Sequence, residues 1–182
     1  MKFFKVLLTT SALFLSFSAY AVHIGSTISY GTGQLIRSDP HDINGGRISI
    51  WAQPNNFVWG PLNVYFDFSF AGWHASHAAE NRNIFVWAIA PVVRLYIYQS
   101  NYVSPYIEGS IGAGLQSATK FGNRKLSINY TFQDRAGIGM AFGKQKNWFV
   151  DWNVIHYSNA DIKTPNGGYT IPVMIDFGYK FM

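Results

Sequence analysis

Alternation of large apolar side chains with polar or small ones is the feature of this chain that most constrains its fold. In the segment 170–181, one face of an extended strand would be entirely apolar, and the other would be mostly polar or small. The apolar face comprises Ile171, Val173, Ile175, Phe177, Tyr179 and Phe181, and the opposite face includes Thr170, Asp176, Gly178 and Lys180. Because successive side chains of a strand point to opposite sides of a sheet, the two-residue period predicts a strand with one apolar and one polar face.

Two further segments show the same period. One apolar face carries Trp148, Val150, Trp152 and Val154, and another carries Leu126, Ile128, Tyr130 and Phe132. Polar residues, among them Asp151, Asn153, Gln133 and Arg135, alternate with them. Strand-like segments recur at 23–32, 47–53, 59–71, 83–97, 102–116, 126–142, 147–158 and 170–181. Turn-forming residues separate these eight segments, and we find no convincing helix of ordinary length.

The pattern favours an all-β fold, an eight-stranded antiparallel transmembrane barrel of the bacterial outer membrane. Segments of about 10 residues with apolar side chains outside and polar ones inside are typical of such barrels. The chain is 18% aromatic and only 13% charged, which is unusual for a soluble domain. A soluble β-sandwich or lipocalin-like barrel would also alternate. The charged Arg135 and Asp151 opposite the apolar face, and the aromatic Phe181 near the C-terminus, favour the membrane barrel.

The first residues resemble an export signal. Lys2 and Lys5 precede an apolar run of about a dozen residues, and small residues at Ala19 and Ala21 follow it. Such a run is too short to span a bilayer, so we expect a Sec signal peptide over 1–21, cleaved after Ala21, and a barrel domain over 22–182. Cleavage would remove two lysines and lower the formal net charge from +5 to +3.

Composition also narrows the chemistry. Cysteine is absent, so the chain can form neither a disulfide framework nor a thiolate metal site. Its positive charges are scattered rather than clustered, which argues against a nucleic-acid partner. His74 and His77 have the spacing of a metal-binding pair but lack suitable partners, and a solvated loop explains them better. We therefore expect no metal and no cofactor.

His156 and Ser158 are the candidate catalytic pair. Two residues apart in a strand, they share one face, with their Cα atoms roughly 6.5 Å apart. A hydroxyl whose proton is taken by a nearby imidazole is the core of serine hydrolysis. With both termini in the periplasm, this seventh strand would run outward. Both residues follow the parity of Trp152, so they should face lipid near the outer leaflet.

These residues also resemble a known family, the outer-membrane lipid A 3-O-deacylases called PagL. The likeness lies in Phe132-Gln133-Asp134-Arg135-Ala136-Gly137-Ile138-Gly139, in His156-Tyr157-Ser158-Asn159-Ala160, and in Ile162, Lys163, Pro165, Asn166 and Gly168. It implies a serine esterase that removes the 3-O-linked hydroxyacyl chain of lipid A, the membrane anchor of lipopolysaccharide. By this resemblance Ser158 is the nucleophile, His156 the general base, and Asn166 part of the oxyanion hole.

The chain departs from the family at the third triad residue. The family's glutamate should follow the histidine by 14 residues, where this chain has Thr170. A shifted loop could supply another carboxylate, a Ser–His dyad could work alone, or activity could be lost. Asp161 is the nearest candidate acid in the sequence. It can equally be interpreted as a solvated charge in a loop. Asp151 and Asp176 should be separated from His156 by the sheet.

Two other functions remain open from the sequence. A barrel that has lost its acid could serve adhesion or envelope structure without catalysis. Another lipid-directed enzyme, such as a phospholipase or acyltransferase, would use the same nucleophile on a different headgroup. Small barrels can also pair through their apolar outer faces, so a homodimer is a further expectation.

Overall fold

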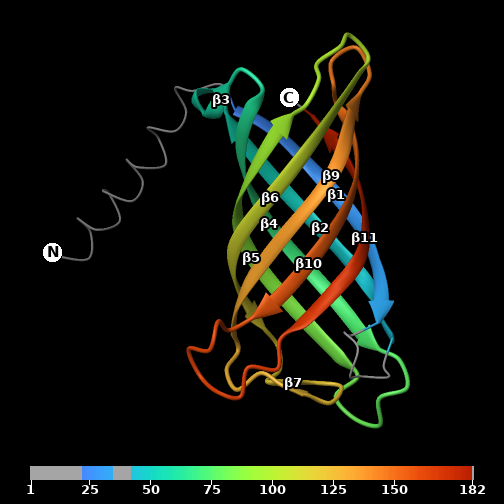
Figure 1. The fold of residues 1–182 in the computed structure, drawn as a ribbon, viewed down its shortest axis with the longest axis vertical. Coiled ribbons are helices and arrows are strands. Elements are labelled where there is room, and N and C mark those ends of the chain that lie inside the picture. Colours follow the sequence, from blue (N-terminus) through green and yellow to red (C-terminus); the bar gives the residue numbers. More distant parts are fainter. Residues whose placement is uncertain (1–21, 35–41, 182) are drawn as a thin grey trace, which may run out of the picture.

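The computed structural model describes residues 22–34 and 42–181. Eight long antiparallel strands wind around a single axis and close into a barrel (Figure 1). They are β1 (Val22–Gln34), β2 (Asp42–Pro54), β4 (Leu62–Ala75), β5 (Asn83–Tyr96), β6 (Val103–Gln116), β9 (Tyr130–Phe142), β10 (Trp148–Ser158) and β11 (Tyr169–Lys180). Closure comes from β1, which pairs with β2 on one side and β11 on the other. The predicted eight-stranded all-β barrel is confirmed.

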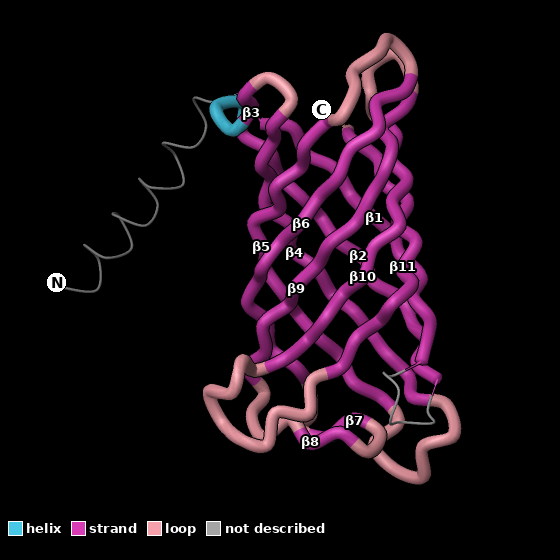
Figure 2. Tube along the Cα trace, in the orientation of Figure 1, coloured by secondary structure: helices cyan, strands magenta, loops and turns pink. Residues whose placement is uncertain are grey.

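Short elements complete the described part of the chain. The two-residue strand β3 (Val58–Trp59) follows a 3-10 turn (Asn55–Phe57) and pairs with β4. A small hairpin of β7 (Lys120–Phe121) and β8 (Arg124–Lys125) lies within the segment between β6 and β9 (Figure 2). No helix in 22–34 or 42–181 has the length and apolar character needed to cross a membrane. The expected signal peptide, 1–21, lies outside the described residues.

The two ends of the barrel differ in the length of their connections. We call the end with segments 76–82, 117–129 and 159–168 the loop end, and the end with 97–102 and 143–147 the turn end. β1 begins and β11 ends at the turn end, where Gly25 is paired with Lys180. Bacterial barrels have short periplasmic turns and longer external loops, so the loop end corresponds to the cell exterior.

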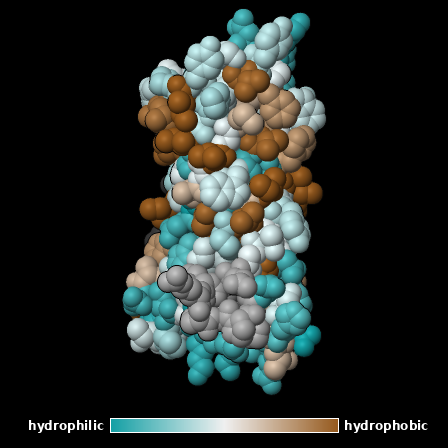
Figure 3. Space-filling model, turned by 45° about the vertical axis from the view of Figure 1, so that its right-hand side comes forward, coloured by the Kyte–Doolittle hydropathy of each residue, from teal (hydrophilic) through white to brown (hydrophobic). Residues whose placement is uncertain are grey.

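The barrel wall is apolar outside, and its interior holds buried polar and charged side chains together with two clusters of apolar ones. Large exposed side chains such as Ile50, Trp87 and Ile111 cover the outer surface. Figure 3 shows hydrophobic side chains across the middle and upper part of one face, with mainly hydrophilic ones over the lower, loop end. A soluble barrel would bury these apolar side chains in its core, so this arrangement favours the membrane alternative.

Charged side chains pair with one another in the barrel interior. Arg47 forms an ion pair with Asp67. Glu108 lies 2.8 Å from Arg94 and 3.3 Å from Arg135, measured between nitrogen and oxygen atoms. This confirms that Glu108 and Arg94 line the interior. We call these ion pairs, with Asp176 at 3.6 Å from Arg135, the interior charge network.

One predicted strand starts later than expected. The alternation from Leu126 led us to expect a strand over 126–142, but β9 begins at Tyr130. Ser127 has a left-handed backbone conformation, with φ of 64°, which no strand residue adopts. Leu126 is instead buried in an apolar cluster at the loop end with Phe121 and Tyr169. Its apolar side chain therefore belongs to the packing of the loops and not to the outer surface.

A bulge in β11 reverses the predicted faces of Thr170 and Ile171. Asn153 is paired with Met174, but Ile155 is paired with Ile171, so β11 contains one extra residue between these pairs. Pro172, which has no amide hydrogen to donate, lies within the irregularity, as is usual for proline in a sheet. Ile171 is consequently fully buried inside, whereas Thr170 lies on the outer side.

Candidate active site

His156 and Ser158 lie on the outer face of β10 at its loop end. The buried and more accessible residues of β10 alternate, and both follow the parity of Trp148 and Trp152. The predicted shared face is thus observed. Between these two side chains, both within the described residues, there is no hydrogen bond. Catalytic hydrogen bonds are often long before substrate binds, so the geometry is compatible with proton transfer.

Thr170 holds one side of the histidine ring. Its Oγ1 lies 2.8 Å from His156 Nδ1, and the two residues are paired across β10 and β11. The bulge in β11 makes this contact possible, because it turns Thr170 to the outer side. If Nδ1 carries the ring proton, its N–H donates a hydrogen bond to the Thr170 hydroxyl, and the unprotonated Nε2 can act as the base. Thr170, at the position where the resemblance implies the family's acid, therefore contacts the ring but carries no charge.

The loop after Ser158 places an amide next to the candidate nucleophile. The backbone N–H of Asn159 donates to Asn166 Oδ1 at 3.0 Å. Because this contact uses the amide oxygen of Asn166, its NH2 group stays available as a donor. The buried Asn159 side chain in turn donates to the carbonyls of Leu126 and Lys163, at 2.9 and 2.8 Å. These bonds fix the 159–168 loop against the 117–129 segment.

Gly168 leaves the space that the site requires, and the sequence analysis assigned it no role. A Cβ atom at this position would lie 3.0 Å from Ser158 Cβ and 3.3 Å from His156 Cε1. It would also lie 2.7 Å from the carbonyl oxygen of Tyr157. Only glycine avoids these contacts. The sequence could have pointed to Gly168 in one way, because it is among the residues that resemble the family.

The carboxylates considered in the sequence analysis occupy three different environments. Asp161 is exposed in the turn after Ser158, with a left-handed φ of 59°. Asp151 and Asp176 are buried inside the barrel, as expected, with the wall between them and His156. Neither interior carboxylate can orient the histidine ring.

Asp134 is the carboxylate that the sequence analysis did not consider. It is paired directly with His156 across β9 and β10. Both residues line an open groove of about 800 Å³ on the outer face, together with Ala136, Val154 and Gly109. Asp134 lies two residues after Phe132, so the alternation could have predicted its place on the outer face. Its position beside His156 follows only from the register between β9 and β10.

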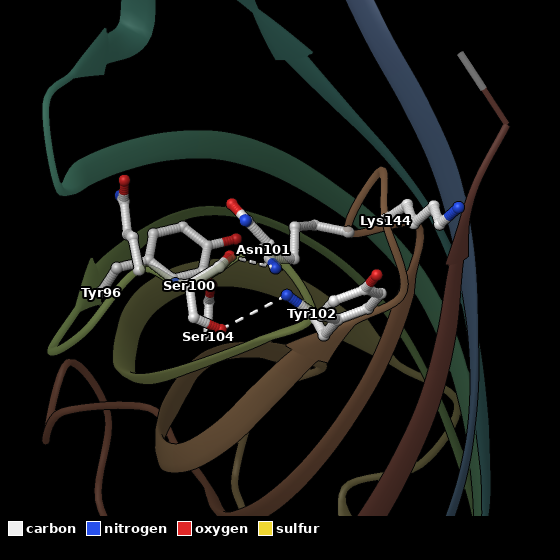
Figure 4. A pocket seen from close by; sticks show the side chains of 8 residues that line it. Tyr96, Ser100, Asn101, Tyr102, Ser104 and Lys144 are labelled. Atoms are coloured by element: carbon white, nitrogen blue, oxygen red, sulfur yellow. Dashed lines mark hydrogen bonds between the residues drawn. The ribbon is translucent and has the colours of Figure 1, made fainter.

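Other polar sites offer no competing chemistry. The side chain of His74 contacts Asn83 at 2.7 Å, and His77 lies exposed in the next loop. Over the described ranges, no group of three or more His, Asp or Glu side chains could hold a metal ion. A polar recess at the turn end contains Tyr96, Ser100, Asn101, Tyr102, Ser104 and Lys144 (Figure 4). It has no histidine or acid and lies at the opposite end from Ser158.

Comparison with known proteins agrees with this geometry. The model of the lipid A 3-O-deacylase (PagL) family matches residues 46–180. The chain belongs to this family. A lipid A deacylase PagL of Pseudomonas aeruginosa is 31% identical over 121 residues, covering 63% of this chain and 67% of the relative. A lipid A deacylase PagL of Bordetella bronchiseptica is 25% identical over 157 residues, covering 86% of this chain and 83% of the relative.

Solved structures support the same assignment. The crystal structure of the outer membrane enzyme PagL has a TM-score of 0.67 and 25% identity, with 86% of this chain and 98% of that chain covered. Neisserial surface protein A has a TM-score of 0.57 and 12% identity, covering 88% of this chain and 97% of the other. The second likeness concerns the fold alone. Membership in the PagL family therefore rests on sequence as well as on shape.

Proposed function

We propose that this protein is a lipid A 3-O-deacylase, in which Ser158 and His156 hydrolyse the ester that holds the 3-O-linked hydroxyacyl chain. As a member of the PagL family it is an ester hydrolase of the outer membrane with lipid A, in lipopolysaccharide, as substrate. The observation that carries the residue assignment is the placement of Ser158 and His156 on the outer face, where a lipid can reach them. Polar side chains facing hydrocarbon are costly and are usually functional.

The reaction follows the general scheme of serine esterases. Ser158 Oγ attacks the ester carbonyl carbon while His156 Nε2 accepts its proton. The new oxyanion receives a hydrogen bond from the NH2 group of Asn166, because the contact with Asn159 uses only the amide oxygen. The intermediate then expels the sugar 3-oxygen, which takes the proton from His156. Water hydrolyses the acyl-Ser158 ester by the same proton route and releases a 3-hydroxy fatty acid.

Thr170 orients the base in this scheme. By accepting a hydrogen bond from Nδ1, its hydroxyl would keep the ring in place and leave Nε2 unprotonated for Ser158. A carboxylate at the same position would also stabilise the imidazolium, which a neutral hydroxyl does much less well. The scheme requires no metal and no cofactor.

Two further expectations accompany this function. We propose that residues 1–21 direct export to the outer membrane as a Sec signal peptide and are then removed. Pairing of two barrels through their apolar outer faces stays a prediction, to be tested by measuring the mass of the detergent-solubilised protein.

The proposed reaction can be tested with purified protein folded in detergent and mixed with lipid A. Released 3-hydroxy fatty acid is measured by mass spectrometry for the wild type, Ser158→Ala and Ser100→Ala. Ser100→Ala is the matched control, because it makes the same change in the recess at the turn end (Figure 4), whereas His156 lies at the loop end. We expect Ser158→Ala to lose activity by about 10⁴-fold or more and Ser100→Ala to retain it. Equal release by Ser158→Ala and the wild type would contradict the assignment.

A further inference from the structure

The contact between His156 and Thr170 leaves a charge without a partner during the reaction. When His156 accepts the Ser158 proton, it becomes a cation at the boundary between the loops and the lipid. In a triad, the acid stabilises this imidazolium as well as orienting the ring. Thr170 can orient the ring through its 2.8 Å contact, but it carries no negative charge. A charge in low-dielectric surroundings needs a nearby opposite charge.

Asp134 is placed to provide that charge. Its Cα is the direct partner of His156 across β9 and β10, so the two side chains lie side by side on the outer face. A negative charge beside an imidazole favours its protonated, cationic form. Thr170 on β11 and Asp134 on β9 therefore flank His156 from its two neighbouring strands.

Asp134 lies on the outer face, whereas Asp67, Glu108, Asp151 and Asp176 are buried inside the barrel. Asp67, Glu108 and Asp176 all face arginines inside the barrel. Asp134 is on the outer face, and its carboxylate has neither a hydrogen bond nor an ion pair with another of the described side chains. A carboxylate left unpaired on a lipid-facing surface is costly for the protein, so its presence there suggests a function. Its neighbour Arg135 points inward to Glu108 and does not neutralise it.

We propose that Asp134 supplies the negative charge that stabilises protonated His156, in place of the carboxylate that position 170 lacks. Orientation and charge, which one acid provides in a triad, are divided here between Thr170 and Asp134. Asp134 takes up no proton: the proton moves from Ser158 Oγ to His156 and then to the leaving oxygen. Asp134 therefore acts only through His156, by stabilising its positive charge, and does not contact the substrate. This inference rests on the proposed function, because it assumes that His156 is the base.

A double-mutant cycle tests this division. We would compare the wild type, Asp134→Asn, Thr170→Glu and the double variant, each folded in detergent. The readout is the rate at which an alkyl fluorophosphonate labels Ser158. In that reaction Ser158 Oγ bonds to phosphorus, fluoride leaves, and His156 takes the proton. The same variants are assayed for kcat and KM on lipid A.

The proposal predicts a dependence on the residue at position 170. Asp134→Asn should slow labelling and lower kcat by about 10- to 100-fold, less than the roughly 10⁴-fold loss when a triad carboxylate that contacts the ring is replaced. In the Thr170→Glu background, where a carboxylate reaches Nδ1, the same change should cost less than about threefold. Asp134→Glu, which keeps the charge, should retain most of the rate.

Control variants separate charge at His156 from charge elsewhere. Glu80→Gln makes the same carboxylate-to-amide change on the exposed loop between β4 and β5 and should leave labelling unchanged. Asp161→Asn tests the competing acid next to Ser158. If Asp161→Asn slows labelling and Asp134→Asn does not, the proposal is overturned in favour of Asp161. An equal cost of Asp134→Asn in both backgrounds, or an effect on KM alone, would also overturn it.

The two readouts separate this inference from the proposed function. Labelling of wild-type Ser158 that depends on Asp134, without deacylation of lipid A, would support the inference and contradict the substrate assignment. Deacylation of lipid A that is insensitive to Asp134→Asn would support the proposed function and contradict this inference. A wild-type Ser158 that is not labelled at all would overturn both, because no base would then be activating it.

Discussion

Inside the barrel, the carboxylates of Asp67, Glu108 and Asp176 each face an arginine, whereas the carboxylate of Asp134 on the outer face does not. The interior groups are buried together, and their charges stabilise one another. On the outer face, Asp134 and Thr170 lie on either side of His156, and Ser158 follows on the same face of β10; we call these four residues the outer cluster. The interior charge network joins side chains of several strands and should stabilise the barrel, while the outer cluster contains the residues to which we assign the reaction.

The two regions should therefore respond differently to substitution. Removing one partner of a buried ion pair leaves a charge that the protein cannot solvate, which destabilises the fold. Removing a residue of the outer cluster takes a polar group away from lipid, which should leave the fold intact but slow the reaction.

The largest expected effect is that of His156→Ala on the outer cluster. Without the base, Ser158 keeps its proton, and we expect kcat to fall by about 10⁴-fold or more. The barrel should remain folded, as judged by its mobility on unheated denaturing gels. Wild-type activity in folded His156→Ala would contradict the assignment of the reaction to the outer cluster.

Glu108→Gln breaks the interior charge network. It removes the negative charge between Arg94 and Arg135, and we expect the free energy of unfolding to fall by about 3–5 kcal/mol. Urea unfolding in detergent measures this loss, and activity per folded molecule should stay near that of the wild type. A loss of activity without a loss of stability would show that the interior network participates in the reaction.

Gly168→Ala tests the space beside the candidate nucleophile. Its Cβ would lie 2.7 Å from the carbonyl oxygen of Tyr157, so the backbone must shift next to Ser158. We expect kcat to fall at least about tenfold, because small displacements of reacting groups are costly. Gly46→Ala, in which the added Cβ would lie 3.3 Å from the nearest atom, is the control. Equal activity of the two variants would remove Gly168 from the site.

Thr170→Val should have the smallest effect. It removes one hydrogen bond to His156 Nδ1 while keeping the shape of the side chain. A net loss of about 1–1.5 kcal/mol corresponds to roughly a tenfold fall in kcat, with KM little changed. Thr170→Ser keeps the hydroxyl and should retain most of the rate. If both variants equal the wild type, Thr170 does not orient the base.

The sequence predicted the barrel because alternation is a local property that each strand carries by itself. The outward placement of His156 and Ser158 followed from the same period. The prediction was wrong for Thr170 and Ile171 because one extra residue in β11 reverses the faces. It was wrong for Leu126 because a left-handed Ser127 ends the alternation before β9 begins.

Of the two residues that flank His156, Thr170 was named from the resemblance to the family, but Asp134 could not be derived from the sequence alone. Asp134 lies 22 positions before His156, and only the register of β9 against β10 brings them together. Register depends on the packing of the whole sheet, which no single segment specifies. Gly168 escaped notice for a similar reason, because its role depends on the close approach of a loop to Ser158.

The most direct test of the account is mass spectrometry of lipid A from a Gram-negative host that produces either the wild-type protein or Ser158→Ala. Both proteins must be folded in the outer membrane. The account predicts that lipid A loses one 3-hydroxyacyl chain with the wild type and keeps it with Ser158→Ala. Unchanged lipid A with both proteins, or the same loss with both, would contradict the claim that the outer cluster deacylates lipid A through Ser158.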